Sequence, residues 1–254
     1  MTPERVLAES AAWVWVPPEA RTVDTDEFLL IAYPAYFSDP TVATRWSSDR
    51  AADELIDEVL EAAHTLGRDA VTFFELSETT RPPDLERRLR ERGAELTETL
   101  AVLALDLTSG VPDLAVPPDL EVRRVADLDD LRATDRIDVE VFGGSLADEE
   151  ALALAASRLA DENRFVVLRD GTPIGAAGLV VAGETLRLWG GAVVASARHT
   201  GAYRALLDHR LRAGVEAGCT LALVKGRVET SAPVLLKAGF RAYGEVRAYR
   251  LVRS

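Results

Sequence analysis

VVASARHTGAYRALL, residues 193 to 207, decides how the chain is interpreted. An apolar run with two adjacent glycines, LRLWGGAVV, leads into it and a long amphipathic segment follows, so it joins an expected strand to an expected helix. The first turn of a helix leaves backbone N–H groups unpaired and carries partial positive charge. Gly201 would let an anion approach that backbone closely. By itself the stretch is either a phosphate-binding loop or an ordinary turn.

Composition limits the class of protein. With 254 residues, 48% of them hydrophobic, the chain can bury the core of one large domain or of two small ones. No apolar run reaches the roughly 18 residues of a membrane helix, and MTPERVLAES does not resemble a signal peptide, so we expect a cytoplasmic protein without a membrane partner. The net charge of -13 argues against nucleic acid as a partner. The single cysteine, Cys219, and the absence of metal-ligand spacing predict no metal site.

The second half of the chain predicts an alternation of strands and helices. The Arg-Asp-Gly-Thr sequence at 169 to 172 is typical of a hairpin turn, and Asp127 is expected to cap a helix. The expected elements are a strand and a helix within 121–142, a polar helix over 146–159, strands over 165–171, 172–183 and 184–194, a helix over 201–217, a strand over 219–224, a helix over 231–238 and a strand over 245–252. This order predicts an α/β layer fold with a mixed sheet flanked by helices.

The first half repeats the second at an offset of 151 positions. Leu55 then falls on Leu206, Gly67 falls on Gly218, and the strand VTFFEL (71–76) falls on ALVKGR (222–227), within the apolar run that begins at TLALVK. Further along, a five-residue insertion in the first copy restores the match between LRERG and LLKAG. We therefore predict two tandem copies of one fold, over 1–112 and 113–254, joined by the proline-containing segment VPDLAVPPD.

The first copy lacks the loop. At the corresponding place it has TRWSSDRAADEL, residues 44 to 55, which contains no glycine and carries Asp49 where an anion would be repelled. The first copy is thus expected to keep the scaffold without the binding function.

The order of elements, the sequence VVASARHTGAYRALL and the later ETSAPVLLKAGF resemble the GCN5-related N-acetyltransferase (GNAT) family. In that family (Gln/Arg)-x-x-Gly-x-(Gly/Ala) cradles the pyrophosphate of acetyl-coenzyme A, and Arg198, Gly201 and Tyr203 take its first, fourth and sixth positions. The strand before the loop splays from the next one and holds the pantetheine arm, which would explain Gly190-Gly191. The residues that the resemblance assigns to acetyl-CoA binding are Ala192, Val193, Val194, Arg198, His199, Thr200, Gly201, Ala202, Tyr203, Thr230 and Ser231, with Val224 to Gly226 on the other side of the cleft.

The reaction that the resemblance implies is direct attack of a neutral amine on the thioester, which requires a carbonyl donor, a base and an acid. The backbone N–H near Val193 is expected to polarise the carbonyl. Glu184 is the base that we select, with Glu140 and Asp138 as alternatives, although each of the three is otherwise a solvated carboxylate. Relatives often carry a tyrosine acid where this chain has Leu235.

Tyr203 is then the candidate for the acid, and its side chain either crowds the pyrophosphate or, as we favour, points away along the helix. Tyr243 is a further candidate donor, Cys219 is expected to be a buried apolar residue, and His209 is expected to face solvent.

The acceptor cannot be read from the sequence. We predict a small-molecule amine acceptor and a monomer or homodimer, with the first copy packed against the second and shaping the acceptor cleft. The alternatives are a non-catalytic acyl-CoA-binding regulatory protein and an acetyltransferase acting on protein amines. The aromatic clusters Trp13-Val14-Trp15 and Tyr33-Pro34-Ala35-Tyr36-Phe37 belong either to a core or to an interface or pocket.

Overall fold

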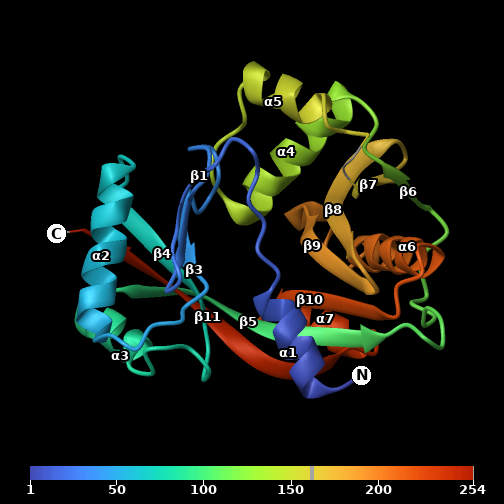
Figure 1. Ribbon diagram of the computed structural model, residues 1–254. Helices are drawn as coiled ribbons and strands as arrows, with labels where there is room; N and C mark the ends of the chain where they lie inside the picture. The colour runs from blue at the N-terminus through green and yellow to red at the C-terminus, as the bar shows by residue number, and fades with distance from the viewer. Residues whose placement is uncertain (161–162, 254) are drawn as a thin grey trace. The chain divides into compact units, whose positions relative to one another are not determined.

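Figure 1 shows the computed structural model of the protein, which describes residues 1–160 and 163–253. The chain folds into two compact units. Unit 1 comprises residues 1–2, 103–225 and 234–241, and unit 2 comprises residues 3–102, 226–233 and 242–254. Each unit therefore takes segments from both halves of the sequence. The boundary between copies at residues 112 and 113 concerns sequence repeats, and it stays a prediction.

Unit 1 is an α/β structure with one parallel strand pair, as the order of its sequence elements predicts. Its strands follow the order β10-β9-β8-β7-β6, in which β9 and β10 are parallel and the other pairs are antiparallel. Its elements are β6 (Leu120–Arg124), α4 (Leu128–Phe142), α5 (Glu149–Ala156), β7 (Asn163–Arg169), β8 (Thr172–Ala182), β9 (Thr185–Val193), α6 (Ala202–Glu216), most of β10 (Leu221–Arg227) and most of α7 (Ser231–Lys237).

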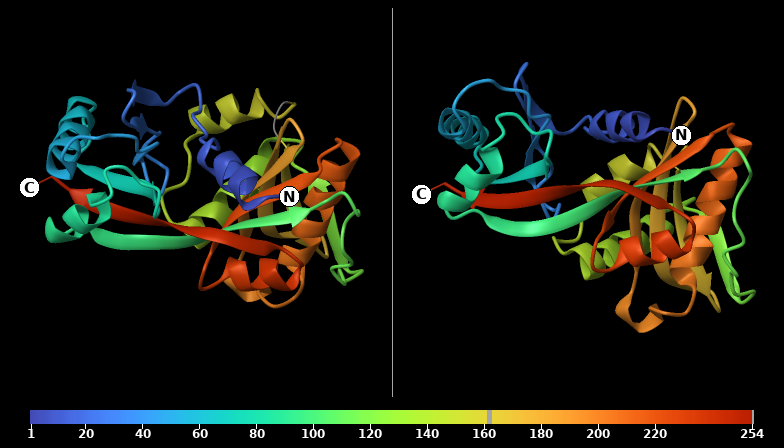
Figure 2. Two further views of the ribbon diagram at one scale, coloured as in Figure 1. Left: turned by 60° about the horizontal axis from the view of Figure 1, so that its bottom comes forward. Right: turned by 90° about the horizontal axis from the view of Figure 1, so that it is seen from below.

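The central strands of unit 1 carry helices on both faces (Figures 1 and 2). Arg164 and Phe165 are neighbours on β7, and successive side chains of a strand point to opposite faces. Arg164 forms an ion pair with Asp138 of α4, whereas Phe165 packs edge-on against His209 of α6, with ring centroids 4.8 Å apart. α4 therefore covers one face of the sheet and α6 covers the other.

Two local signals act as the sequence predicts. The Asp127 side chain caps α4 by accepting a hydrogen bond of 2.9 Å from the Asp130 N–H. Asp170 and Gly171 both have positive φ, at 50° and 75°, which is the backbone of a type I′ turn between the paired residues Arg169 and Thr172.

Several predicted boundaries are wrong: the strand predicted over 219–224 is β10, and the one predicted over 165–171 is β7. Two further differences have a clear local cause. The helix predicted over 146–159 is the shorter α5, because the Asp148 side chain accepts a hydrogen bond from the Ala151 N–H and so fixes the first turn there. The last strand begins at Arg241 and not at residue 245, since it continues directly from the turn at Gly239, whose φ is +96°.

Unit 2 has a sheet of the order β1-β2-β3-β4-β11-β5. Its elements are α1 (Pro3–Ala11), β1 (Arg21–Asp24), β2 (Leu29–Ala32), β3 (Thr41–Thr44), α2 (Ala52–Thr65), β4 (Ala70–Leu76), α3 (Leu85–Glu91), the first part of β5 (Glu95–Asp106) and nearly all of β11 (Arg241–Val252). The last strand, which the sequence assigns to the second copy, pairs antiparallel with β4, from Arg247 opposite Leu76 to Val252 opposite Ala70. Tyr249 and Leu251 of that strand belong to the buried core of unit 2.

The bounds of the elements recur along the chain. β4 (Ala70–Leu76) and β10 (Leu221–Arg227) begin and end 151 positions apart, while α3 and α7 begin and end 146 positions apart. The difference of five residues is the insertion read from the sequence. The two-copy organisation stays a prediction, and this recurrence supports it.

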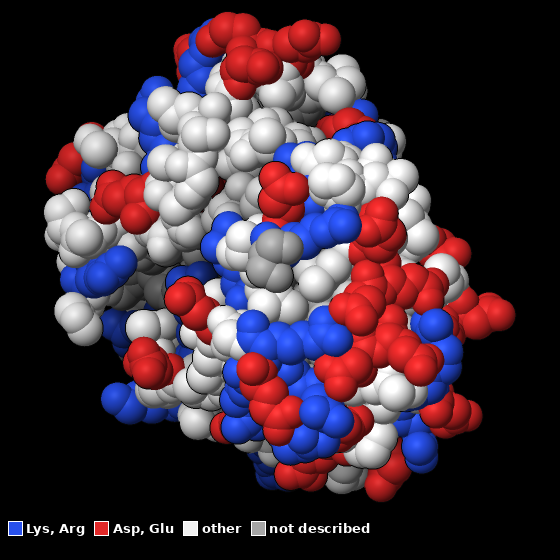
Figure 3. Space-filling model, turned by 90° about the vertical axis from the view of Figure 1, so that its left-hand side faces the viewer, with Lys and Arg blue, Asp and Glu red and all other residues white. Residues whose placement is uncertain are grey.

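Charges of both signs are interspersed on the surface that Figure 3 shows. On α3, Arg87 pairs with Asp84 and Glu91, and Arg92 beyond its end pairs with Asp53 and Asp57. Such exposed pairs contribute little to stability. Among the described residues no helix is both long enough and apolar enough to cross a bilayer.

Candidate functional site

β9 and β10 part halfway along their length. Four residues of each strand are in register, from Thr185 opposite Leu221 to Leu188 opposite Val224. Trp189 and Lys225 are the first residues beyond the last pair, although β9 continues to Val193. The edge of β9 after Leu188 therefore borders a gap instead of a neighbouring strand.

A bulge in β9 lies at the start of this gap. The pair Ala176 and Ala192 and the pair Gly178 and Trp189 are two residues apart on β8 but three residues apart on β9. The extra residue falls at the glycine pair, where Gly190 has a φ of +60° that other residues rarely adopt. The bulge that Gly190-Gly191 suggests is thus present.

The backbone of Val193 faces the gap. The N–H of Val194 donates 3.0 Å to Ile174 O on the β8 side, and Ala192 O lies on that side as well, 2.7 Å from where a Gly175 Cβ would stand. Because a trans peptide directs its N–H and C=O oppositely, both polar groups of Val193 point away from β8. Of the three residues predicted to bind pantetheine through their backbone, Val193 alone faces the gap along this edge. Ala192 N–H and Val194 N–H are turned to β8.

The loop after β9 presents a run of free backbone donors. A short 3₁₀ turn over Ala195–Ala197 leads to His199 with a φ of +63° and Gly201 with a φ of +93°. The first bond of α6 runs from Ala205 N–H to Gly201 O at 2.9 Å. From His199 to Arg204, no backbone N–H donates to an acceptor in the described part of the chain. Consecutive unpaired N–H groups at a helix start form an anion-binding concavity, and the exposed Arg198 adjoins it.

The packing of a neighbouring residue, besides anion binding, explains why position 201 is a glycine. A Cβ at Gly201 would stand 2.6 Å from Cγ of Pro117, so the linker residue packs directly on this glycine. Arg204 donates 3.0 Å to Leu114 O, and Arg169 pairs with Asp119 at 2.9 Å. The predicted linker, residues 111 to 119, therefore packs against the start of α6 within unit 1.

Tyr203 points inward, beneath the bulge. Its ring lies 2.9 Å from the place that a Gly191 Cβ would take, and its hydroxyl is hydrogen-bonded to the Arg210 guanidinium. Burial raises the pKa of Tyr203 above its ordinary value, and Arg210 opposes the shift. This position agrees with the expectation that the side chain points away along the helix, since Arg210 lies seven residues further along α6, and the absence of a side chain at Gly191 opens the space that the ring fills.

Arg210 is the buried cation of the site, with 2% of its surface exposed. Its Nε donates 3.0 Å to Leu206 O, and one terminal nitrogen reaches Gly178 O at 3.1 Å and Trp189 O at 3.3 Å. These last two carbonyls flank the bulge. Burial lowers the pKa of Arg210, and the Tyr203 hydroxyl opposes that shift. Sequence reasoning missed Arg210 because a charged residue in an amphipathic helix is usually solvated.

Comparisons with known proteins agree with this geometry. Residues 129–240, less than half of the chain, match the model of the acetyltransferase (GNAT) family. A GCN5-related N-acetyltransferase from Kribbella flavida superposes with a TM-score of 0.65 at 16% identity, over 98% of this chain and 95% of that one. One from Sphaerobacter thermophilus gives 0.65 at 16%, over 98% and 85%. A tandem GNAT protein from the clavulanic acid biosynthesis pathway gives 0.58 at 14%, over 98% and 92%. No curated protein sequence matches the chain.

The fold is that of the GNAT acetyltransferases. The predicted fold class is thereby confirmed, and the family match over 129–240 indicates acyl-CoA-dependent acetyl transfer. The parting of β9 and β10 and the donor-rich loop both lie inside the matched residues.

Among the predicted bases, the GNAT fold brings Glu140 to the site and leaves Glu184 away from it. Oε1 of Glu140, on α4, accepts 2.8 Å from the Ala195 N–H, and two residues along the chain from Val193 span at most about 7 Å. Glu184 precedes the other end of β9, and nine residues at about 3.3 Å each separate it from Val193 by up to about 30 Å.

Asp138 is the second acidic group near β9. Its Oδ2 pairs with Arg164 at 2.5 Å, while Oδ1 is buried without a hydrogen bond in the described structure. Burial raises the pKa of the Asp138 carboxyl, and Arg164 opposes the shift. The Arg164 guanidinium lies 6.0 Å from the Trp189 ring centroid, so Asp138, Arg164 and Trp189 form a charged and aromatic group on the α4 face.

The remaining predicted donors contribute less. Leu235 is 0% exposed, and burial raises the pKa of the Cys219 thiol, which agrees with the apolar role expected for that residue. His209, which is expected to face solvent, is instead half-buried because it packs on Phe165, and burial lowers its pKa. Thr230 and Ser231 belong to unit 2, as does Tyr243. No group of three His, Cys, Asp or Glu side chains in the described residues could hold a metal ion.

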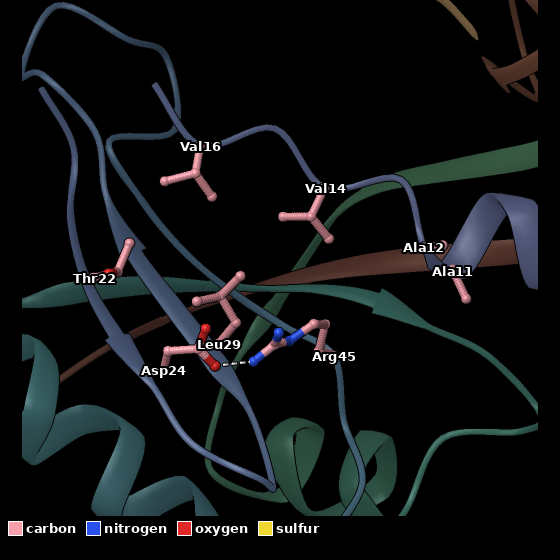
Figure 4. Close-up of a pocket in the computed structure, with 8 residues that line it drawn as sticks. All are labelled: Ala11, Ala12, Val14, Val16, Thr22, Asp24, Leu29 and Arg45. Carbon is pink, nitrogen blue, oxygen red and sulfur yellow. Dashed lines mark hydrogen bonds and ion pairs between the residues drawn. The ribbon is translucent and has the colours of Figure 1, made fainter. Parts of the chain in front are cut away.

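Unit 2 contains a cavity of about 420 Å³ of its own (Figure 4). Apolar side chains and one ion pair, between Asp24 and Arg45, line it. Beside it the two predicted aromatic clusters meet: Trp15 stacks on Tyr33 with centroids 5.8 Å apart, and Phe37 adjoins both. The lining residues are Ala11, Ala12, Val14, Val16, Thr22, Asp24, Leu29 and Arg45.

Proposed function

We propose that the protein is an N-acetyltransferase that moves the acetyl group of acetyl-CoA to the amine of a small molecule. The single observation that carries this proposal is the parting of β9 and β10, with the backbone of Val193 facing the gap and a run of unpaired N–H groups directly after it. A plain core strand followed by a turn would have no use for either feature.

The donor site that we propose lies along β9 and the loop. The N–H groups from His199 to Tyr203, together with Arg198, would hold the pyrophosphate, since they supply donors and positive charge. Ala202 contributes its N–H only, because its side chain is 1% exposed. The backbone of Val193 would bind the pantetheine arm or the thioester carbonyl.

Three groups would share the chemistry. The Val193 N–H would stabilise the negative charge that develops on the carbonyl oxygen. Glu140, held by Ala195 N–H, would accept the proton that the ammonium form of the acceptor loses, replacing Glu184 in that role. Tyr203 would return a proton to the leaving thiolate, because a hydroxyl that accepts from Arg210 keeps its own proton to donate.

The acceptor proposed is a cationic primary amine. The buried Oδ1 of Asp138 and the ring of Trp189 are groups that attract an ammonium ion. Both lie on the face of the sheet that α4 covers, and Glu140 of α4 accepts a hydrogen bond from the Ala195 N–H. A protein amine in an open groove is the alternative acceptor. Residues 1–112 would be the degenerate copy of a tandem pair, and one structural relative, from the clavulanic acid biosynthesis pathway, is itself a tandem GNAT protein.

The test measures free thiol released from acetyl-CoA over a panel of diamines, amino sugars and lysine-containing peptides. We expect at least one small amine to raise the rate above the background without acceptor. Glu140→Gln should lower kcat and shift the pH profile while leaving acetyl-CoA affinity within about twofold. A panel in which peptides alone are substrates would contradict the small-molecule acceptor.

A non-catalytic acyl-CoA-binding protein is the second candidate. The observations that favour it are Pro117 packed on Gly201 and the buried Leu235 where relatives often have the acid. It predicts acetyl-CoA binding with no thiol release for any amine, so the same panel decides between the two functions.

A further inference from the structure

Lys225 lies where β9 and β10 part. Val224 is the last residue of β10 paired with β9, and Lys225 follows it directly. The chain has two lysines, Lys225 and Lys237. A lysine placed at the vertex of the gap is therefore a feature of this site and not of a lysine-rich surface.

The side chain of Lys225 is on the face that carries the proposed chemistry. Residues in register on neighbouring strands point to the same face, as Leu223 and Arg187 do. Because side chains alternate along a strand, Lys225 points to the same face as Leu223, and Trp189 points to the same face as Arg187. The Trp189 ring adjoins Arg164, which pairs with Asp138 of α4. Lys225 and Trp189 thus share the α4 face, from which Glu140 reaches Ala195.

Partial burial changes the charge of Lys225. Its side chain is half-buried, and burial lowers its pKa from 10.5 to about 7. At neutral pH about half of the Lys225 amines carry a free electron pair, against fewer than about one in a thousand for a lysine in water. Attack on a thioester requires that electron pair.

We propose that Lys225 is itself an acetyl acceptor and takes an acetyl group from the donor bound between β9 and β10. This proposal rests on the proposed function. In the step, Lys225 Nζ forms a bond to the carbonyl carbon and the carbon–sulfur bond breaks. The thiolate leaves with that electron pair and takes up the proton that the nitrogen loses. The products are Nε-acetyl-lysine and free coenzyme A, so no further reactant is needed.

The modification would restrain the enzyme. An acetyl group on Lys225 removes a charge and adds volume at the vertex of the gap, where donor and acceptor must meet. Because an amide is far less reactive than a thioester, the modified form would accumulate when acetyl-CoA is present and acceptor amine is absent. Acceptor amine would compete with Lys225 for the same donor.

The experiment incubates the full chain with acetyl-CoA and no amine, then measures the intact mass and maps acetylated peptides. Lys237 on α7 is exposed and serves as the internal control. We expect one added acetyl group per chain at Lys225, at least tenfold more occupancy than at Lys237, and suppression by excess free coenzyme A. Lys225→Arg should lose the modification and Lys237→Arg should keep it.

Donor binding is measured in parallel from the shift in melting temperature with acetyl-CoA. Binding without acetylation of Lys225 overturns this proposal and leaves the proposed function intact. The absence of binding overturns both. Equal acetylation of the two lysines, unaffected by coenzyme A, overturns self-acetylation as well, since it would mark ordinary chemical reactivity.

Discussion

The segments after β9 in unit 1 and after β3 in unit 2 occupy corresponding places in the predicted repeat, but they use their backbone donors differently. From His199 to Arg204 the N–H groups are unpaired within the described chain. In unit 2 the N–H groups of Ser47, Ser48 and Arg50 donate to Glu27 O, Arg81 O and the Ser48 hydroxyl. The backbone donors after β9 are therefore available to a ligand, whereas those after β3 form hydrogen bonds within unit 2.

The gaps beside these segments differ in the same way. In unit 2, β3 and β4 are also parallel and paired over a short length, at Val42 opposite Thr72 and Ala43 opposite Phe73. Trp46 then stacks on Phe73, with centroids 5.4 Å apart, and its indole N–H donates 2.7 Å to Phe74 O. Trp46 thus closes in unit 2 the place that stays open in unit 1. Under the predicted two-copy organisation, the first copy would have lost the site because Trp46 fills it.

Trp46→Ala should have the largest effect, a loss of about 3 to 4 kcal/mol of unfolding free energy, since it removes a stacked ring and leaves a carbonyl without its donor. Urea denaturation followed by tryptophan fluorescence and circular dichroism measures it. Trp46→Phe keeps the stacking and should lose about 1 kcal/mol. If the alanine variant gained a second acyl-CoA site, the unpaired loop would not be what makes a site.

Arg210→Met should cost about 2 to 3 kcal/mol, because Gly178 O and Trp189 O lose their donor beside the bulge. It should also weaken acetyl-CoA binding, since the bulge sets the direction of the Val193 backbone. Arg212→Met is the control on the same helix: Arg212 is 61% exposed and pairs with Asp208, so its loss should cost under about 0.5 kcal/mol. Equal costs for the two variants would refute the role given to Arg210.

Lys225→Met should make stability less dependent on pH. The folded pKa of Lys225 is about 7, below its unfolded value of 10.5. Between these values the unfolded chain holds a proton that the folded chain lacks, so the free energy of unfolding rises with pH. The destabilisation by this lysine is largest below pH 7, where its side chain is charged in the folded protein. The full shift would correspond to about 5 kcal/mol, at about 1.4 kcal/mol for each pKa unit, but solvent screens a half-buried side chain. Lys225→Met should then be more stable by about 2 kcal/mol near pH 6, with the difference vanishing towards pH 10. Thermal unfolding across this range decides it, and a constant difference would contradict the account.

Gly201→Ala should cost about 1 to 2 kcal/mol, from the contact with Pro117 and from the φ of +93°. Combined with Pro117→Ala, the same substitution should cost less, because the ring atoms that it meets are gone. A double-mutant cycle in urea measures the coupling. Additive costs would mean that the linker does not press on this glycine.

Much of the fold could be predicted because its signals are local. Asp127, the Asp170-Gly171 turn and the Gly190-Gly191 pair act through neighbouring backbone, and each has the structure expected of it. The contact of Tyr203 with Gly191, the burial of Arg210 and the Pro117 contact depend on residues distant in sequence. A single sequence carries no pattern for them.

The same reason explains the choice of base and the last strand. Glu184 and Glu140 are both acidic residues beside apolar runs, and only the packing of α4 brings one of them to Ala195. β11 pairs with β4 across more than 160 positions, so its partner could not be inferred from its own residues.

The most direct test of the central claim is a calorimetric titration of the full chain with acetyl-CoA, repeated on Arg198→Glu and on Ser47→Glu, the corresponding exposed position of unit 2. We predict one site per chain, at least tenfold weaker binding for Arg198→Glu, and unchanged binding for Ser47→Glu. Two sites per chain, or equal weakening by both substitutions, would contradict the claim that unit 1 alone keeps the donor loop.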